Sequence, residues 1–352
     1  GPTADDLTVP TVADYCGLPT SPDPALAERI TAVIRGWGRY DADAALPPNI
    51  VAAIDKQSLV PAGATPIGPT GTAPGLAIPA DGARPAVLIL PGPPHELQQM
   101  WPMALITEPV QSALTARVPA RHSTVRAYGL SEPDLAATLR GAAGAVDGFG
   151  ELEITTCMRG GELAIDVRYP ENAGTAFLAL KALLLQAHGE RIYSPDGDDL
   201  DALLAAALAG RTIATAESCT GGLLAARLTE RAGSSAYVLG GIVSYANEVK
   251  SGVLDVPAEL IATHGAVSEP VAAAMADGAR ARTGAQVAVS TSGIAGPGGA
   301  VPGKPVGTVC FGLAVDDRPT VAVTRRFPGD RGTVRALATA YALHLVLDSL
   351  TG

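Results

Sequence analysis

The segment 216–222 reads AESCTGG and places a hydroxyl beside a thiol in one short turn rich in small residues. It follows a predicted buried strand and precedes a predicted helix. Such a turn can present a nucleophile at the mouth of a sheet, and the first amides of the helix can stabilise an oxyanion. The segment therefore predicts Ser218 as a nucleophile. A serine before a helix is also a common N-cap, so a structural interpretation stays open.

Cys219 is the rival nucleophile in the same turn. A thiolate is intrinsically more reactive than a serine hydroxyl, and a helix N-terminus lowers the pKa of a thiol. The residue types alone do not choose between the two side chains.

The segment 244–250, SYANEVK, follows a second predicted strand and brings in a candidate base. Lys250 is one of only four lysines among 25 basic residues. A lysine can take a proton from serine when burial lowers its pKa from about 10.4 toward neutrality. Tyr245 could orient the lysine or relay a proton. A surface lysine and a half-buried tyrosine are the structural alternative.

Two further segments could hold an anion. The loop 290–299, STSGIAGPGG, follows another predicted strand, and its amides could form an anion-binding nest. It lacks both GxxxxGK[ST] and GxGxxG, so an ordinary loop is an equal interpretation. The segment 325–335 contains four arginines in an acidic chain, which predicts a positive pocket or else a charged loop.

The elements around these segments alternate between strand and helix. Apolar runs predict strands at 212–216, 237–244, 286–291, 306–315 and 320–327. Helical spacing predicts helices at 200–208, 222–229, 257–263, 269–283 and 333–350. The alternation predicts an α/β/α layered domain over residues 198–352.

The chain before residue 198 divides into two further predicted domains. Residues 121–197 follow a βαββα order with a short final strand, which predicts a small α+β domain. Residues 1–120 contain a predicted helix at 23–36 and a predicted strand at 84–90, an α/β pattern. The chain starts with glycine rather than methionine, so we expect its true beginning to be missing.

Composition narrows the class of protein. Single hydrophobic cores stop growing at roughly 250 to 300 residues, so a chain of 352 residues should form more than one domain. The net charge of −10 argues against direct nucleic-acid binding. The sequence contains no uncharged apolar run long enough to predict a membrane span. The four cysteines lack CxxC spacing, which favours a reducing, cytoplasmic location over a disulfide scaffold or zinc site. We expect a homodimer, the commonest symmetric assembly.

The C-terminal segments together resemble the CinA (competence-damage-inducible) family. Seven motifs occur in family order: AESCTGG (216–222), AGSSA (232–236), SYANEVK (244–250), HGAVSEP (264–270), SGIAGPGG (292–299), KPVGTV (304–309) and GDR (329–331). The resemblance implies that this domain hydrolyses the carboxamide of nicotinamide mononucleotide, giving nicotinate mononucleotide and ammonia without a cofactor.

The resemblance also implies a role for individual residues. Ser218 attacks, Lys250 takes its proton and passes it to ammonia, and Tyr245 supports the pair. The oxyanion is held by amides near Thr220 and Gly221, in a turn completed by Cys219 and Gly222. Substrate-binding positions are Ser234, Ser292, Gly293, Gly296, Arg331 and Arg335, of which the two arginines and the 293–296 loop would bind the phosphate.

The N-terminal domain resembles the MoaB/MogA-like, molybdopterin-binding domain of the same family. The similar segments are GPTADD (1–6), GTAPG (71–75) and PGPPHEL (91–97). The family has further elements before the position of residue 1, so we expect this domain to be incomplete. In addition, 54–57 reads IDKQ where the family usually has Asn-Arg-Lys-Gln. The resemblance implies an alternative or additional activity, a metal-dependent ADP-ribose pyrophosphatase. Asp5 and Asp6 are candidate ligands of a divalent metal, or else caps of a turn.

The middle domain resembles the KH-type linker of the family. It lacks a GXXG loop near its first helix, so we assign it no nucleic-acid role. A third hypothesis, a non-enzymatic role in DNA uptake, would need a protein partner, and no tail or low-complexity segment indicates one. The expected partner is therefore a small-molecule nucleotide.

Overall fold

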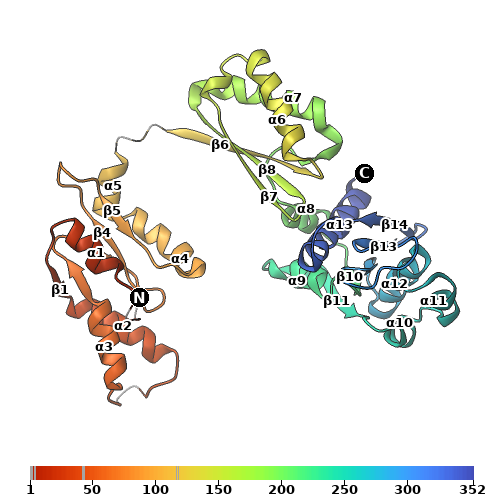
Figure 1. Ribbon diagram of the computed structural model, residues 1–352, viewed down its shortest axis with the longest axis horizontal. Coiled ribbons are helices and arrows are strands. Elements are labelled where there is room, and N and C mark those ends of the chain that lie inside the picture. Colours follow the sequence, from red (N-terminus) through yellow and green to blue (C-terminus); the bar gives the residue numbers. More distant parts are fainter. Residues whose placement is uncertain (1–2, 4, 42–43, 116, 118) are drawn as a thin grey trace. The chain divides into compact units, whose positions relative to one another are not determined.

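The computed structural model describes residues 3, 5–41, 44–115, 117 and 119–352. The chain forms two compact units, residues 1–118 and 119–352, and each is described by itself (Figure 1). Both mix helices with β-sheets, so the chain has the predicted α/β class. Within the described residues, no helix has the length and apolar character needed to cross a membrane.

The first unit contains two small antiparallel sheets, β1-β2 and β3-β4-β5. Its elements are α1 (Thr8–Tyr15), β1 (Thr20–Pro22), α2 (Pro24–Gly36), α3 (Pro48–Gln57), β2 (Leu59–Pro61), β3 (Thr65–Ile67), β4 (Gly75–Ile78), β5 (Val87–Ile89), α4 (Pro94–Leu105) and α5 (Glu108–Leu114).

Two predicted elements of the first unit are found. Helix α2 begins where the Asp23 side chain accepts a hydrogen bond from the Leu26 amide at 2.9 Å, as an N-cap does. The strand predicted at 84–90 is shorter, because Pro85 and Pro91 flank it and cannot donate to a sheet.

The second unit begins with a four-stranded antiparallel sheet in the order β7-β8-β6-β9. Its elements are β6 (Ala120–Tyr128), α6 (Glu132–Ala145), β7 (Glu153–Arg159), β8 (Glu162–Pro170), α7 (Gly174–His188) and β9 (Ile192–Ser194). The βαββαβ order matches the order predicted from the sequence. The strands and both helices share one apolar core, which includes Val125, Leu135, Ile165 and Leu180.

A mixed five-stranded sheet, in the order β11-β10-β12-β13-β14, forms the rest of the second unit (Figure 1). Strand β10 is parallel to β11 and β12, whereas β13 is antiparallel to β12 and β14. Its elements are α8 (Leu200–Ala207), β10 (Ile213–Glu217), α9 (Leu223–Glu230), β11 (Val238–Val243), α10 (Asn247–Leu254), α11 (Ala258–His264), α12 (Glu269–Thr283), β12 (Val287–Gly293), β13 (Thr308–Val315), β14 (Val321–Arg326) and α13 (Arg331–Thr351).

Helices cover both faces of this sheet. Residues of β12 alternate between the two faces, as strand geometry requires: Val287 and Val289 join the core under α8, α9 and α13, and Ala288 joins the core under α10 and α12. The predicted α/β/α layering is therefore confirmed.

An ion-pair cluster joins the two sheets of the second unit. Glu162 on β8 accepts from Arg227 on α9 at 3.1 Å, and Arg227 also binds Asp201 at 3.0 Å. His344 on α13 lies with Nε2 3.2 Å from the same glutamate, and its ring stacks on Tyr128 with centroids 4.0 Å apart. The cluster therefore ties α9 and α13 to the four-stranded sheet.

We expect Arg227→Ala to lower the free energy of unfolding by about 2 kcal/mol, because two half-buried carboxylates lose their cation. Burial alone would raise the pKa of Glu162, but His344 and Arg227 outweigh it and hold the pKa below its usual 4.5. The stabilisation is thus present above about pH 4.5 and lost as pH falls through the lower, folded-state pKa. Urea unfolding at pH 7 and at pH 3 measures both effects.

Arg168→Ala is the matched control, because Arg168 pairs with Glu153 on the surface at 3.4 Å. Its removal should change the free energy of unfolding by less than about 0.5 kcal/mol. Equal losses in the two variants would contradict a stabilising role for the cluster.

Candidate active site

Four segments meet at one edge of the five-stranded sheet. The parallel strands β10, β11 and β12 all end there, and β14 ends at the same edge because it is parallel to β12. Strands β11 and β12 lie on opposite sides of β10, and at such a point the chain connections separate and leave a crevice. The residues that follow these four strands are therefore brought together.

The turn after β10 carries Ser218. The Ser218 amide donates to the Thr291 carbonyl at 2.9 Å, and the Gly221 amide donates to the Ser218 carbonyl at 3.1 Å. Gly221 and Gly222 have φ of +61° and +98°, a region that glycine enters without strain. The glycine pair thus allows the tight turn that leads into α9.

Lys250 lies beside this serine. It extends from α10, and only 1% of its surface is exposed. Its Nζ lies 3.2 Å from Ser218 Oγ, 2.8 Å from the Ser244 carbonyl and 3.1 Å from the Tyr245 carbonyl. Burial lowers the pKa of Lys250. The structure therefore rules out the alternative of a surface lysine.

These contacts suit a neutral amine acting as a base. A neutral lysine has two N–H donors and one lone pair. The carbonyls of Ser244 and Tyr245 can accept both donors, which leaves the lone pair for the Ser218 hydroxyl. The arrangement can therefore take the serine proton and return it to a leaving group.

Cys219 has the opposite environment for a nucleophile. Its thiol is buried, with 5% exposure, and burial raises its pKa to about 12. At neutral pH it is therefore a protonated thiol, and Lys250 donates no hydrogen bond to it. The geometry favours Ser218, a choice that the residue types left open.

The Tyr245 side chain faces outward, with 60% exposure, so it is not half-buried as the structural alternative had it. Its carbonyl, rather than its hydroxyl, contacts Lys250. The hydroxyl accepts from Arg331 at 3.1 Å, and Arg331 also donates to the Gly296 carbonyl at 3.0 Å. Tyr245, Arg331 and Gly296 thus lie together at the edge of the site.

Arg335 holds the nucleophile turn from α13. Its Nε donates to the Cys219 carbonyl at 3.2 Å and its Nη2 to the Thr220 carbonyl at 2.7 Å. In a trans peptide the N–H points away from the carbonyl, so the Thr220 amide faces away from Arg335. Arg335 was predicted to bind the substrate phosphate, but these two bonds use its Nε and one Nη2 donor.

Ser292 and Gly293 have packing roles in the structure. Ser292 is buried, and its hydroxyl donates to the Ala266 carbonyl at 2.6 Å, so its proton is not offered to a ligand. A side chain at Gly293 would meet the Thr308 carbonyl at 2.9 Å. Both residues therefore pack the end of β12, and neither offers a free side-chain donor to a ligand.

Ser234 is not brought to this edge. It precedes β11, and the start of β11 pairs with the start of β10, whereas Ser218 follows the end of β10. Its hydroxyl donates to the Thr229 carbonyl at 3.5 Å. Within this chain Ser234 therefore lies at the opposite edge of the sheet from Ser218.

Sequence analysis missed Glu217. Its side chain is fully buried and accepts hydrogen bonds from the amides of Gly222, Leu224 and Ala225 at 2.8, 3.0 and 2.9 Å. The Gly222 amide, predicted to be part of the oxyanion turn, is therefore occupied. The sequence did contain a signal for this role: a charged residue at the end of a buried strand needs hydrogen-bond or ionic partners nearby.

Comparisons with known proteins show the family of this chain. The family model of the CinA C-terminal domain matches residues 198–350. A CinA-like protein of Mycolicibacterium gilvum (strain PYR-GCK) is 52% identical over an alignment that covers 100% of this chain and 82% of the relative. The chain belongs to the CinA family.

This chain is also similar to other CinA proteins. A CinA-like protein of Mycobacterium tuberculosis (strain ATCC 25177 / H37Ra) is 50% identical, with coverage of 100% of this chain and 82% of its own. Among solved structures, the competence damage-inducible protein A of Klebsiella pneumoniae is 42% identical and aligns with 43% of this chain and 94% of its own, with a TM-score of 0.42.

Asp5 and Asp6 are the expected metal ligands in the first unit of this CinA family chain. Asp5 is exposed, and Asp6 lines two hollows, of about 40 and 240 Å³, that also share Val9 and Pro74. In the described part of the chain, no three His, Cys, Asp or Glu side chains gather as metal ligands. The described residues thus offer no such set of ligands, and a divalent metal at Asp5 and Asp6 stays a prediction.

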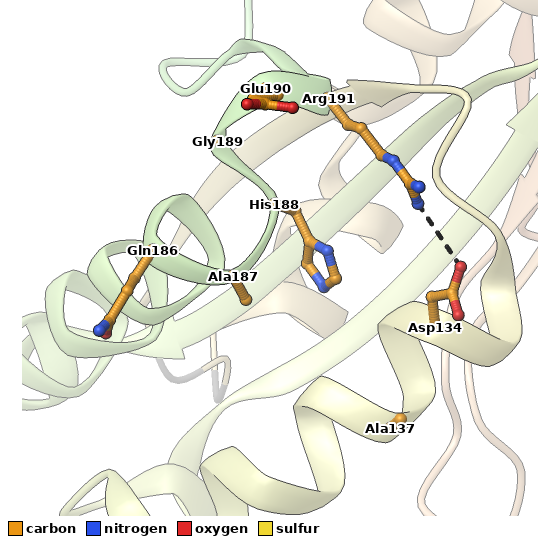
Figure 2. A pocket seen from close by; sticks show the side chains of 8 residues that line it. All are labelled: Asp134, Ala137, Gln186, Ala187, His188, Gly189, Glu190 and Arg191. Carbon is orange, nitrogen blue, oxygen red and sulfur yellow. Dashed lines mark ion pairs between the residues drawn. The ribbon is translucent and has the colours of Figure 1, made fainter.

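A separate pocket of about 550 Å³ opens between α6 and the end of α7 (Figure 2). Arg191 pairs with Asp134 at its rim at 3.5 Å, and His188 bonds Thr138 at 2.8 Å. None of the predicted site residues lines it.

Proposed function

We propose that this chain hydrolyses the carboxamide of nicotinamide mononucleotide to nicotinate mononucleotide and ammonia. The observation that carries the proposal is the 3.2 Å contact between Lys250 Nζ and Ser218 Oγ, in the turn that leads into α9. The substrate comes from the resemblance of the seven motifs to the CinA family and its nicotinamide mononucleotide deamidase domain.

The first half of the reaction forms an ester. Lys250 accepts the Ser218 proton as Oγ bonds to the carboxamide carbon, and the carbonyl electrons move onto oxygen. Among the described residues the amides of Cys219 and Thr220 donate to no backbone carbonyl, so they can bind this oxyanion. As the intermediate collapses, the C–N bond breaks and Lys250 returns the proton to nitrogen, which leaves as ammonia.

The second half releases the acid. A water molecule gives a proton to Lys250 and attacks the ester carbon. The C–O bond to Ser218 then breaks, and Lys250 returns the proton to Oγ. The products are a carboxylic acid and the free enzyme, and no redox change or cofactor enters the balance.

The reaction is tested by product analysis. Nicotinamide mononucleotide incubated with the purified chain should give nicotinate mononucleotide and ammonia in equal amounts, with the same rate in EDTA. Cleavage of the pyrophosphate of ADP-ribose without any deamidation would contradict the proposal.

Arg331 is the proposed phosphate ligand, because its exposed guanidinium lies at the edge of the site beside Tyr245. Arg331→Ala should raise KM for the mononucleotide about 10- to 100-fold with a smaller change in kcat, which is the loss expected for a charge-assisted hydrogen bond. Steady-state assays with nicotinamide riboside, which lacks the phosphate, should show no such loss.

Arg318→Ala provides the control, because Arg318 follows β13 at the opposite edge of the sheet and donates to the Ser349 carbonyl. Its kinetic constants should match those of the wild type. If Arg331→Ala weakens the riboside and the mononucleotide equally, Arg331 does not bind the phosphate.

A further inference from the structure

Glu217 carries four hydrogen bonds on a fully buried carboxylate. Besides the three amides of α9, it accepts from the Thr215 hydroxyl at 3.1 Å. Among the described residues no cation pairs with it within 4 Å. Its charge is instead balanced by the first amides of a helix, where the helix dipole favours a negative group.

The position of Glu217 makes these bonds specific to the nucleophile turn. It is the last residue of β10 and immediately precedes Ser218, and its carbonyl accepts from the Ser244 amide at 2.8 Å. Its backbone therefore belongs to the sheet while its side chain holds the start of α9. The turn of residues 218–221 is fixed at both ends by one residue.

The same bonds decide which amides remain available. The Ser218 and Gly221 amides donate to backbone carbonyls, and the Gly222 amide donates to Glu217. In the described turn, only the amides of Cys219 and Thr220 donate to neither a backbone carbonyl nor the Glu217 carboxylate. If Glu217 released α9, these two amides would lose their fixed direction.

We propose that Glu217 is a positioning residue that holds the Ser218 turn in shape, so that the Cys219 and Thr220 amides meet the oxyanion. The inference rests on the proposed function only in that Ser218 is the attacking group. Glu217 also accepts hydrogen bonds from the amides of Gly222, Leu224 and Ala225. These amides at the start of α9 are therefore not free to bind the substrate phosphate.

Glu217→Gln is a sharp test because it keeps the shape of the side chain. A carboxamide offers only one acceptor oxygen, so whichever way it turns, its NH₂ group meets at least one backbone N–H donor in place of an acceptor. The turn must then shift. We expect kcat for the mononucleotide to fall about 100-fold, the loss seen when an oxyanion donor is removed, with KM within about threefold of the wild type.

Labelling of Ser218 by a fluorophosphonate gives a readout that does not need the natural substrate. The labelling rate of folded Glu217→Gln protein should fall about as much as kcat. The control is Asp199→Asn, because Asp199 also caps a helix, α8, through the Ala202 amide at 2.7 Å but lies outside the turn. Its labelling rate and kcat should stay within about twofold of the wild type.

The outcomes separate the two claims. A wild type that is labelled at Ser218 but releases no ammonia contradicts the proposed function and leaves labelling as the test of Glu217. Folded Glu217→Gln protein that keeps labelling within threefold of the wild type overturns the positioning role. If that variant does not fold, Thr215→Val removes one of the four bonds: a loss of threefold or more in labelling supports the inference, and an unchanged rate overturns it.

Discussion

Ser218→Ala should abolish ammonia release from nicotinamide mononucleotide, with kcat reduced by at least about 10⁴-fold. Removal of a serine nucleophile from a comparable enzyme removes nearly all of its rate acceleration. Because Ser218 is buried at the end of β10 and alanine is smaller, the variant should still fold. Ammonia assays with a matched far-ultraviolet circular dichroism spectrum measure both points.

Cys219→Ala is the control that separates the two candidate nucleophiles. The Cys219 thiol packs in the core beneath the turn, so its loss should lower stability by about 1 to 2 kcal/mol while kcat falls less than about tenfold. Full activity in Ser218→Ala together with none in Cys219→Ala would reverse the assignment.

Lys250→Met should reduce kcat about 10³-fold or more, because the Ser218 hydroxyl loses the amine base beside it. Methionine fills a similar volume without a charge to bury, so the variant should unfold at no lower urea concentration than the wild type at pH 7. Lys181→Met is the control: it breaks an ion pair between Lys181 on α7 and Asp196, away from the Ser218 turn, and should retain wild-type kcat.

The pH profile tests the same lysine. Below its pKa the amine is protonated and cannot take the serine proton, so kcat/KM should rise about tenfold per pH unit and then level off. Burial lowers this pKa, so the plateau should begin below the ordinary lysine value of 10.5. A limb that continues unchanged to pH 10.5 would contradict a buried general base.

The convergence of the reactive segments was predictable from the sequence. Ser218, Lys250 and the 293–296 loop each follow a predicted strand, and the carboxyl ends of parallel strands share one edge. The eight-residue helix α10 was not predicted, because its apolar residues are too few to show a clear helical period. Its presence decides how deeply Lys250 is buried.

Other features depend on contacts that sequence spacing does not encode. The role of Glu217 arises only when α9 begins directly above it, which follows from the turn geometry. Arg335 reaches the turn across 115 residues of chain. Ser234 belongs to a motif near Ser218 in sequence, yet it lies at the other edge of the sheet, because α9 returns the chain to that edge before the parallel strand β11 begins.

The covalent step is the centre of the account, and mass spectrometry of the acid-quenched enzyme tests it most directly. Wild-type protein mixed with nicotinamide mononucleotide and quenched before steady state should carry the substrate minus ammonia as an ester on the peptide that contains Ser218. The same mass on Cys219, or turnover by Ser218→Ala at the wild-type rate, would contradict the account.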